Sequence, residues 1–133
     1  MKQLLKKTGL LLLIITSTLL ISCSKDDDNN PTNTPPAGNW AISMYFDTGD
    51  ETSNFTGYTF SFAANGVVTA TNGTNTVTGT WSQTSTKFIL NFGTTALFDD
   101  LNDDWLIVEK TSTSIKLKED NPAQDDRLEF TRL

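Results

Sequence analysis

The residue best suited to covalent chemistry in this chain is its single cysteine, Cys23, because a thiol can form a thioether with an acyl-bearing group. Cys23 stands between an apolar run that ends at Ile21 and an acidic run that begins at Asp26. A chain with one cysteine cannot form an internal disulfide. The thiol is therefore free and reactive, bonded to another molecule, or covalently modified.

The residues before Cys23 resemble the lipobox of bacterial lipoproteins, with branched Leu20 and small Ser22. The resemblance implies that the thiol takes a diacylglyceryl group and that cleavage before Cys23 frees an amine for a further acyl chain. Several chains, at about 0.8 kcal/mol per buried CH₂, anchor a protein stably. We therefore expect a membrane partner reached through lipid on Cys23. An ordinary secretory peptide is the alternative.

The first 37 residues read as targeting and tether segments. Residues 1–22 form a predicted signal peptide, with lysines near the start and an apolar run over Leu10–Ile21. That run is too short to span about 30 Å of hydrocarbon as a helix. Residues 23–37 form the lipidated cysteine and a tether rich in Pro, Asn, Thr and Asp, predicted to be disordered.

A short charged run follows the cysteine. Lys25, Asp26, Asp27 and Asp28 resemble the lipoprotein export signal of Bacteroidetes. In that group the signal sends lipoproteins to the outer face of the outer membrane, so the resemblance implies exposure at the cell surface. In the alternative, these acids only keep the tether soluble and the protein faces the periplasm.

Composition argues against several functions. The chain has 10 basic and 16 acidic residues, whereas a nucleic-acid partner requires a basic face. It has no histidine, which removes the commonest general base and metal ligand. No nucleophile elbow or phosphate-binding glycine loop is present. We expect no enzymatic activity, no cofactor and no nucleic-acid partner.

Residues 38–133 read as one all-β domain, because short runs with period-two alternation recur between turn residues. In the first run we expect Trp40, Ile42, Met44 and Phe46 to face the core. The segment Thr94–Leu101 could form a short helix. The predicted strands are Trp40–Phe46, Tyr58–Phe62, Val67–Thr71, Thr76–Trp81, Lys87–Phe92, Trp105–Glu109, Ser114–Lys118 and Arg127–Thr131.

Eight short strands in sequential hairpins fit either a closed barrel or a two-sheet sandwich. Gly38-Asn39-Trp40 resembles the G-x-W that opens the first strand of lipocalins and related calycins. The wider pattern after residue 37 resembles small lipocalin-like lipoproteins of Bacteroidetes. This resemblance implies an eight-stranded antiparallel up-and-down barrel, with Arg132 of the last strand packed over Trp40. The domain is expected to be monomeric.

Loop lengths predict the polarity of the barrel. Connections alternate between its ends, and the second, fourth and sixth are tight. The tether is then at the tight-turn end, and the longer loops form an opposite rim. Most carboxylates of the domain fall on that rim: Asp47, Asp50, Glu51, Asp99, Asp100, Asp103, Asp104, Glu119, Asp120, Asp125 and Asp126.

Three interpretations of this acidic rim remain open. The acids solvate long loops, or they attract a cationic ligand or protein partner. In the third, Asp99, Asp100, Asp103 and Asp104 offer oxygen ligands to Ca²⁺, although EF-hand spacing is absent.

The aromatic residues of the strands, Phe46 included, either line an apolar pocket or fill the barrel. The candidates for lining a ligand are Tyr58, Phe60, Trp81, Phe88 and Trp105. If they line a pocket, the protein is a surface lipoprotein that binds a small apolar molecule. If they fill the barrel, it is an interaction or structural module of the envelope that acts through its acidic outer loops.

Overall fold

The structure is a computed structural model that describes residue 34 and residues 36–133. The predicted signal peptide, the lipidation site Cys23 and the export signal Lys25–Asp28 lie outside the described residues. No helix in the described part has the length and apolar character needed to cross a membrane.

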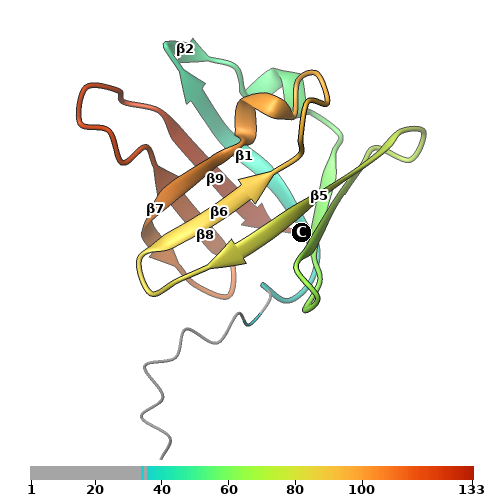
Figure 1. The fold of residues 1–133 in the computed structure, drawn as a ribbon. Helices are drawn as coiled ribbons and strands as arrows, with labels where there is room; N and C mark the ends of the chain where they lie inside the picture. Colours follow the sequence, from blue (N-terminus) through green and yellow to red (C-terminus); the bar gives the residue numbers. More distant parts are fainter. Residues whose placement is uncertain (1–33, 35) are drawn as a thin grey trace, which may run out of the picture.

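The described chain is a closed antiparallel barrel (Figure 1). Except at β2, which folds back on the end of β1, successive strands are neighbours, and β9 pairs with β1 to close the barrel. This confirms the predicted eight-stranded up-and-down fold. The elements are β1 (Trp40–Asp47), β2 (Gly49–Asp50), η1 (Thr52–Phe55), β3 (Thr59–Phe62), β4 (Val67–Thr71), β5 (Thr76–Gln83), β6 (Lys87–Asn91), η2 (Asp99–Leu101), β7 (Asp103–Lys110), β8 (Ser114–Lys118) and β9 (Arg127–Arg132).

Regular alternation of buried apolar and outward-facing polar residues explains most strands. In β8, Ile115 and Leu117 are 0% and 2% exposed, while Lys116 and Lys118 between and after them face outward. The β3–β4 hairpin turns at Asn65-Gly66, where Gly66 has φ +84° and the Asn65 side chain accepts a hydrogen bond from the Val67 amide. These are the local signals that predict a hairpin from sequence.

The prediction of which β1 side chains face the core is wrong beyond Ile42. A β-bulge lies between Ile42 and Met44 in the pairing with β9. Because an extra residue reverses the parity of a strand, Tyr45 turns inward at 2% exposure and Met44 turns outward at 38%. Phe46 is consequently on the outer face, half-buried, and is not an interior aromatic.

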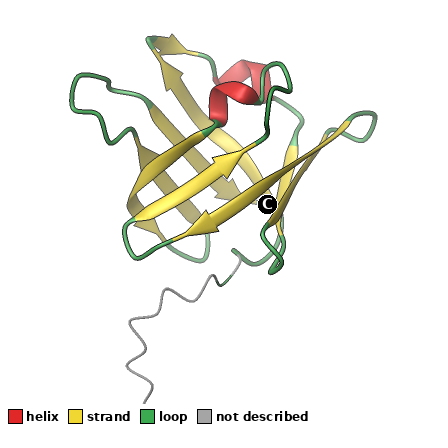
Figure 2. Ribbon diagram, in the orientation of Figure 1, coloured by secondary structure: helices red, strands yellow, loops and turns green. Residues whose placement is uncertain are grey.

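The two 3₁₀ turns lie over the rim (Figure 2). The predicted helix over Thr94–Leu101 is confined to η2, and η1 was not expected from the sequence. β1 meets β3 at the single pair Trp40 and Phe60, so the two strands diverge beyond it. The segment around η1 occupies this opening, because the Glu51 amide bonds the Tyr45 carbonyl at 2.9 Å and the Tyr45 amide bonds Thr52 Oγ1 at 2.9 Å.

The barrel has two different ends. The chain enters β1 opposite the end of β9, beside the tight turns between β3 and β4, β5 and β6, and β7 and β8 (Figure 1). The longer loops with η1 and η2 lie at the other end. The strands of the barrel lie within Trp40–Arg132, and the residues of its buried core lie within Trp40–Phe130.

Candidate functional site

Trp40 and Arg132 are paired across β1 and β9 at the tether end. Trp40 is 1% exposed. The Arg132 guanidinium lies against Gly38, since a Cβ on Gly38 would lie 2.9 Å from Arg132 Nε. Arg132 Nη1 also donates to the Ser112 carbonyl at 3.4 Å. Gly38 therefore leaves room for the arginine and takes a left-handed φ of +89°, which accounts for the glycine of the G-x-W pattern.

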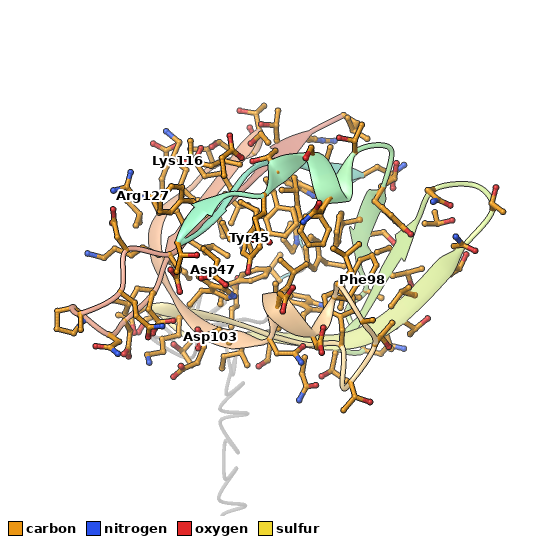
Figure 3. All side chains as sticks on the ribbon, turned by 90° about the horizontal axis from the view of Figure 1, so that it is seen from above. Tyr45, Asp47, Phe98, Asp103, Lys116 and Arg127 are labelled. Carbon is orange, nitrogen blue, oxygen red and sulfur yellow. The ribbon has the colours of Figure 1, made fainter. Side chains whose placement is uncertain are left out.

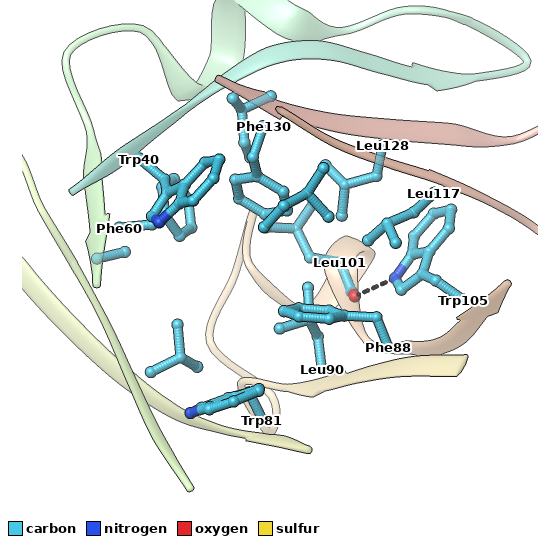
Figure 4. Packing of buried hydrophobic residues seen from close by; sticks show 14 of the residues in the cluster. Trp40, Phe60, Trp81, Phe88, Leu90, Leu101, Trp105, Leu117, Leu128 and Phe130 are labelled. Atoms are coloured by element: carbon cyan, nitrogen blue, oxygen red, sulfur yellow. Dashed lines mark hydrogen bonds between the residues drawn. The ribbon is translucent and has the colours of Figure 1, made fainter. Parts of the chain in front are cut away.

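Four of the residues predicted to line a ligand, Phe60, Trp81, Phe88 and Trp105, belong to one buried cluster (Figure 4), and Tyr58 packs against that cluster. Trp81 stacks on Phe88 with ring centroids 5.6 Å apart, and the Trp81 indole donates to the Ala63 carbonyl. The Trp105 indole donates to the Leu101 carbonyl at 3.1 Å. The exposed fractions of Phe60, Trp81, Phe88 and Trp105 are between 0% and 2%, and Tyr58 is half-buried.

Edge-to-face ring contacts continue through the barrel interior. Phe60 and Phe62 both contact Phe130, with centroids 5.3 and 5.7 Å apart, and Phe62 contacts Phe88 at 5.4 Å. Such pairs contribute about 0.5–1.5 kcal/mol each beyond the area they bury. The described residues include no buried charged or polar residue. These rings pack together in the interior, which is where an eight-stranded barrel can otherwise hold one small ligand.

Loop residues cover the mouth of the barrel at the rim. Phe55, Phe98 and Leu101 are 2%, 2% and 0% exposed. Phe98 packs against Phe55 at 5.7 Å, and Tyr45 packs edge-on against Phe55 at 5.5 Å. Figure 3 shows Tyr45 and Phe98 from above this end of the barrel. The Tyr45 hydroxyl donates to the Asp100 carbonyl at 3.0 Å, and burial raises the pKa of Tyr45. The sequence did not predict that these residues cover the core, because Phe55 and Leu101 lie in single 3₁₀ turns and Phe98 directly precedes one, where no periodicity marks a buried face.

A polar contact lies at the tether end. Lys110 pairs in register with Ile115, whose side chain is fully buried, so Lys110 also points toward the interior. Its ammonium donates to Gln83 Oε1, and burial lowers the pKa of Lys110. The sequence places this lysine at the end of a strand beside other charges, so it does not stand out there.

Several acids of the rim are engaged with each other or with Lys87. The Lys87 ammonium bonds both Asp104 and Asp120, and these bonds raise its pKa. Burial raises the pKa of Asp103 to about 7, with a hydrogen bond to Glu119 as the second cause. The same hydrogen bond lowers the pKa of Glu119, so the two carboxyls share one proton near neutral pH.

The four aspartates considered as calcium ligands do not converge. Asp99 and Asp100 are exposed on η2, and the Asp104 carboxylate is held by Lys87. Within the part of the chain that the structure describes, no three Asp, Glu, His or Cys side chains form a group that could hold a metal ion. Among the described residues, Asp99, Asp100, Asp103 and Asp104 therefore form no common group of metal ligands.

Comparisons with known proteins bear on the fold. No known protein family matches the chain, and no curated protein matches it. A solved structure that it resembles is that of a DUF4847 family protein from Bacteroides vulgatus ATCC 8482. The TM-score is 0.54 and the identity is 14%, over 74% of this chain and 94% of the other. At this identity the likeness establishes a shared β-barrel fold.

Proposed function

We propose that this chain is a lipoprotein held in the outer membrane by acyl groups on Cys23, exposed at the cell surface, with its barrel serving as a rigid interaction module. In this proposal it catalyses no reaction and needs no cofactor. The lipobox-like residues before Cys23 support the anchor, and the Lys-Asp run after it supports the surface location.

The packed interior of the barrel is the observation that best supports a role as an interaction module. Among the described residues, nineteen buried hydrophobic side chains form one cluster, and the covering residues Phe55, Phe98 and Leu101 belong to it. A carrier needs space for its cargo, whereas a module that acts through its surface needs a rigid scaffold. The filled barrel therefore favours the second function that the sequence left open.

The polarity of the barrel suggests which surface is presented. The described chain begins at the tether end, and the acidic rim is at the opposite end. A tether that is attached to a membrane would leave this rim facing outward. Its carboxylates would then steer cationic partners toward the rim, more strongly at low than at high salt.

One observation favours the carrier of a small apolar molecule as a second candidate. The Trp40 indole nitrogen is buried without a hydrogen-bond partner among the described residues. A buried donor is normally satisfied by protein or water, so an acceptor on a bound molecule would serve the same purpose.

Membrane fractionation of a Cys23→Ala variant tests the anchor. We expect the wild-type protein to remain with membranes after a carbonate wash and the variant to be released. Ser24→Ala is the matched control and should stay anchored. Retention of the Cys23→Ala variant on washed membranes would contradict the proposal.

A further inference from the structure

Two β-bulges bring apolar side chains to one outer wall of the barrel. The bulge in β1 exposes Met44, and a second bulge, between Ile107 and Glu109 of β7, exposes Val108 at 59%. With Leu133, these are the exposed large hydrophobic residues of the described chain. β8 and β9 lie between the two bulged strands, so the exposed side chains flank a shared surface.

Two open hollows lie on this wall, below the loop that joins β8 to β9. The smaller has a volume of about 180 Å³ and is lined by Met44, Phe46, Asp125 and Arg127. The larger has a volume of about 410 Å³, and its lining includes the apolar Val108, the cations Lys116 and Lys118, and the acidic Glu129. Asp125 and Arg127 line both, so the hollows adjoin at this ion pair. We call the two hollows together the wall groove. The larger one alone falls within the roughly 300–1,000 Å³ of small-molecule sites.

The register across this wall places two cations side by side. Lys118 is directly opposite Arg127, and the next neighbours on either side are Leu106 and Phe46. Like charges directly opposite each other on a sheet are destabilising, and an anion between them removes that penalty. Arg127 and Lys116 project outward on the same side of the barrel (Figure 3).

Among the described cations of the wall groove, Lys118 is available to bind an anion, because the other two are in ion pairs. Lys116 pairs with Glu109 at 3.5 Å, and Arg127 Nη2 bonds both Asp125 oxygens at 2.8 Å. Lys118 makes no ion pair with any residue that the structure describes. The Asp125 side chain is 74% exposed on its loop, so it can turn to solvent when a competing anion approaches Arg127.

We propose that the wall groove binds a fatty acid, with its carboxylate between Lys118 and Arg127 and its alkyl chain against Met44 and Phe46. The apolar–cation–cation–apolar order of the row matches an amphiphile with one anionic end. A simple anion would gain nothing from the two apolar flanks, and a cationic amphiphile would be repelled by the row. This site lies outside the barrel and does not depend on the membrane anchor.

The chain supplies separate reporters for the groove and for the interior. Met44 is the only methionine after Met1, so a ¹³C-methyl methionine label reports on the groove. The indole N–H signals of Trp40, Trp81 and Trp105 report on the barrel interior. The experiment is an NMR titration of residues 23–133 carrying Cys23→Ala with sodium decanoate, kept below its micelle concentration.

We expect decanoate to shift the Met44 methyl signal in a saturable manner and to leave the indole signals unchanged. Sodium acetate and decyltrimethylammonium are the ligand controls and should shift it far less. Lys118→Gln should weaken decanoate binding about three- to fivefold, as expected for the loss of one exposed ion pair. Asp125→Asn should strengthen it. Lys110→Gln, at the tether end and outside both hollows, is the matched charge control and should change it less than about twofold.

Four results would overturn the inference: no shift of Met44, an equal shift with acetate, an equal shift with the cationic amphiphile, or equal weakening by Lys110→Gln and Lys118→Gln. A saturable shift of the indole signals would mean that decanoate enters the barrel. That result would contradict the filled interior of the proposed function as well. If neither the Met44 methyl signal nor the indole signals shift, the proposed groove site is overturned and the filled interior is not.

Discussion

Trp40 and Arg132 are directly opposite each other in the ladder between β1 and β9, where the first and last strands close the barrel. The pair is 92 positions apart in the chain, and the backbone of Gly38 lies against the Arg132 guanidinium. Closure thus depends on contacts between the extreme ends of the domain. Non-local pairing of this kind is formed late and slowly in folding.

Replacing Gly38 tests this closure. Gly38→Ala should lower the free energy of unfolding by about 1–2 kcal/mol, because φ is +89° and the new Cβ would lie 2.9 Å from Arg132 Nε. Urea denaturation provides the measurement. Gly49→Ala is the matched control, since a Cβ there meets nothing within 4 Å. Equal stability of both variants and wild type would show that the close approach is unimportant.

Truncation of Phe98 tests whether the mouth of the barrel is closed. Phe98→Ala should lower the free energy of unfolding by about 3–5 kcal/mol, because the ring is buried among Phe55, Phe60 and Phe92. Leu133→Ala, at a side chain with 71% exposure, should change it by less than about 0.5 kcal/mol. A similarly small change in Phe98→Ala would indicate that the loop does not cover the core.

The pKa of Asp103 predicts a dependence of stability on pH. Its pKa rises from 3.8 to about 7 on folding, so between these values the folded chain holds a proton that the unfolded chain has lost. Stability from this group is present at low pH and decreases as pH rises toward 7. The pKa of Glu119 is lowered, so its own contribution is lost only as pH falls below its ordinary value of 4.5.

Asp103→Asn should therefore reduce the change in melting temperature between about pH 5 and pH 7. It should also raise the melting temperature at pH 8, because the amide keeps the hydrogen bond without the charge. Asp99→Asn removes a charge from the exposed face of η2 and serves as the control. If the two variants follow the same pH profile, the Asp103–Glu119 contact does not govern this window.

The sequence predicted the strands well where turns and alternation agree, as in β8 and in the Asn65-Gly66 hairpin. It failed in β1, because a bulge reverses the parity of the strand without any local signal at Ser43 or Met44. It also did not predict that Phe55 and Phe98 cover the core, since a single aromatic residue outside the strands belongs to no repeating pattern that would mark it as buried. The partners of Lys87 depend on the stagger of β6, β7 and the β8–β9 loop, which no local pattern encodes.

The charged run after Cys23 can be tested on intact cells. Replacing Lys25, Asp26, Asp27 and Asp28 with alanine should leave the protein in the membrane fraction and remove its labelling by antibody at the surface. Alanine at Asn29, Asn30, Thr32 and Asn33 changes as many tether positions and should preserve surface labelling. Undiminished labelling of the first variant would contradict the export role.

Native mass spectrometry of the protein purified from its own membranes tests the central claim, a filled barrel that works from its outer surface. We predict the mass of the acylated chain beginning at Cys23, with the bound fraction of any co-purified amphiphile reduced in the Lys118→Gln variant. A stoichiometric apolar molecule whose bound fraction is unchanged in that variant would contradict the account, because the interior would then hold a ligand.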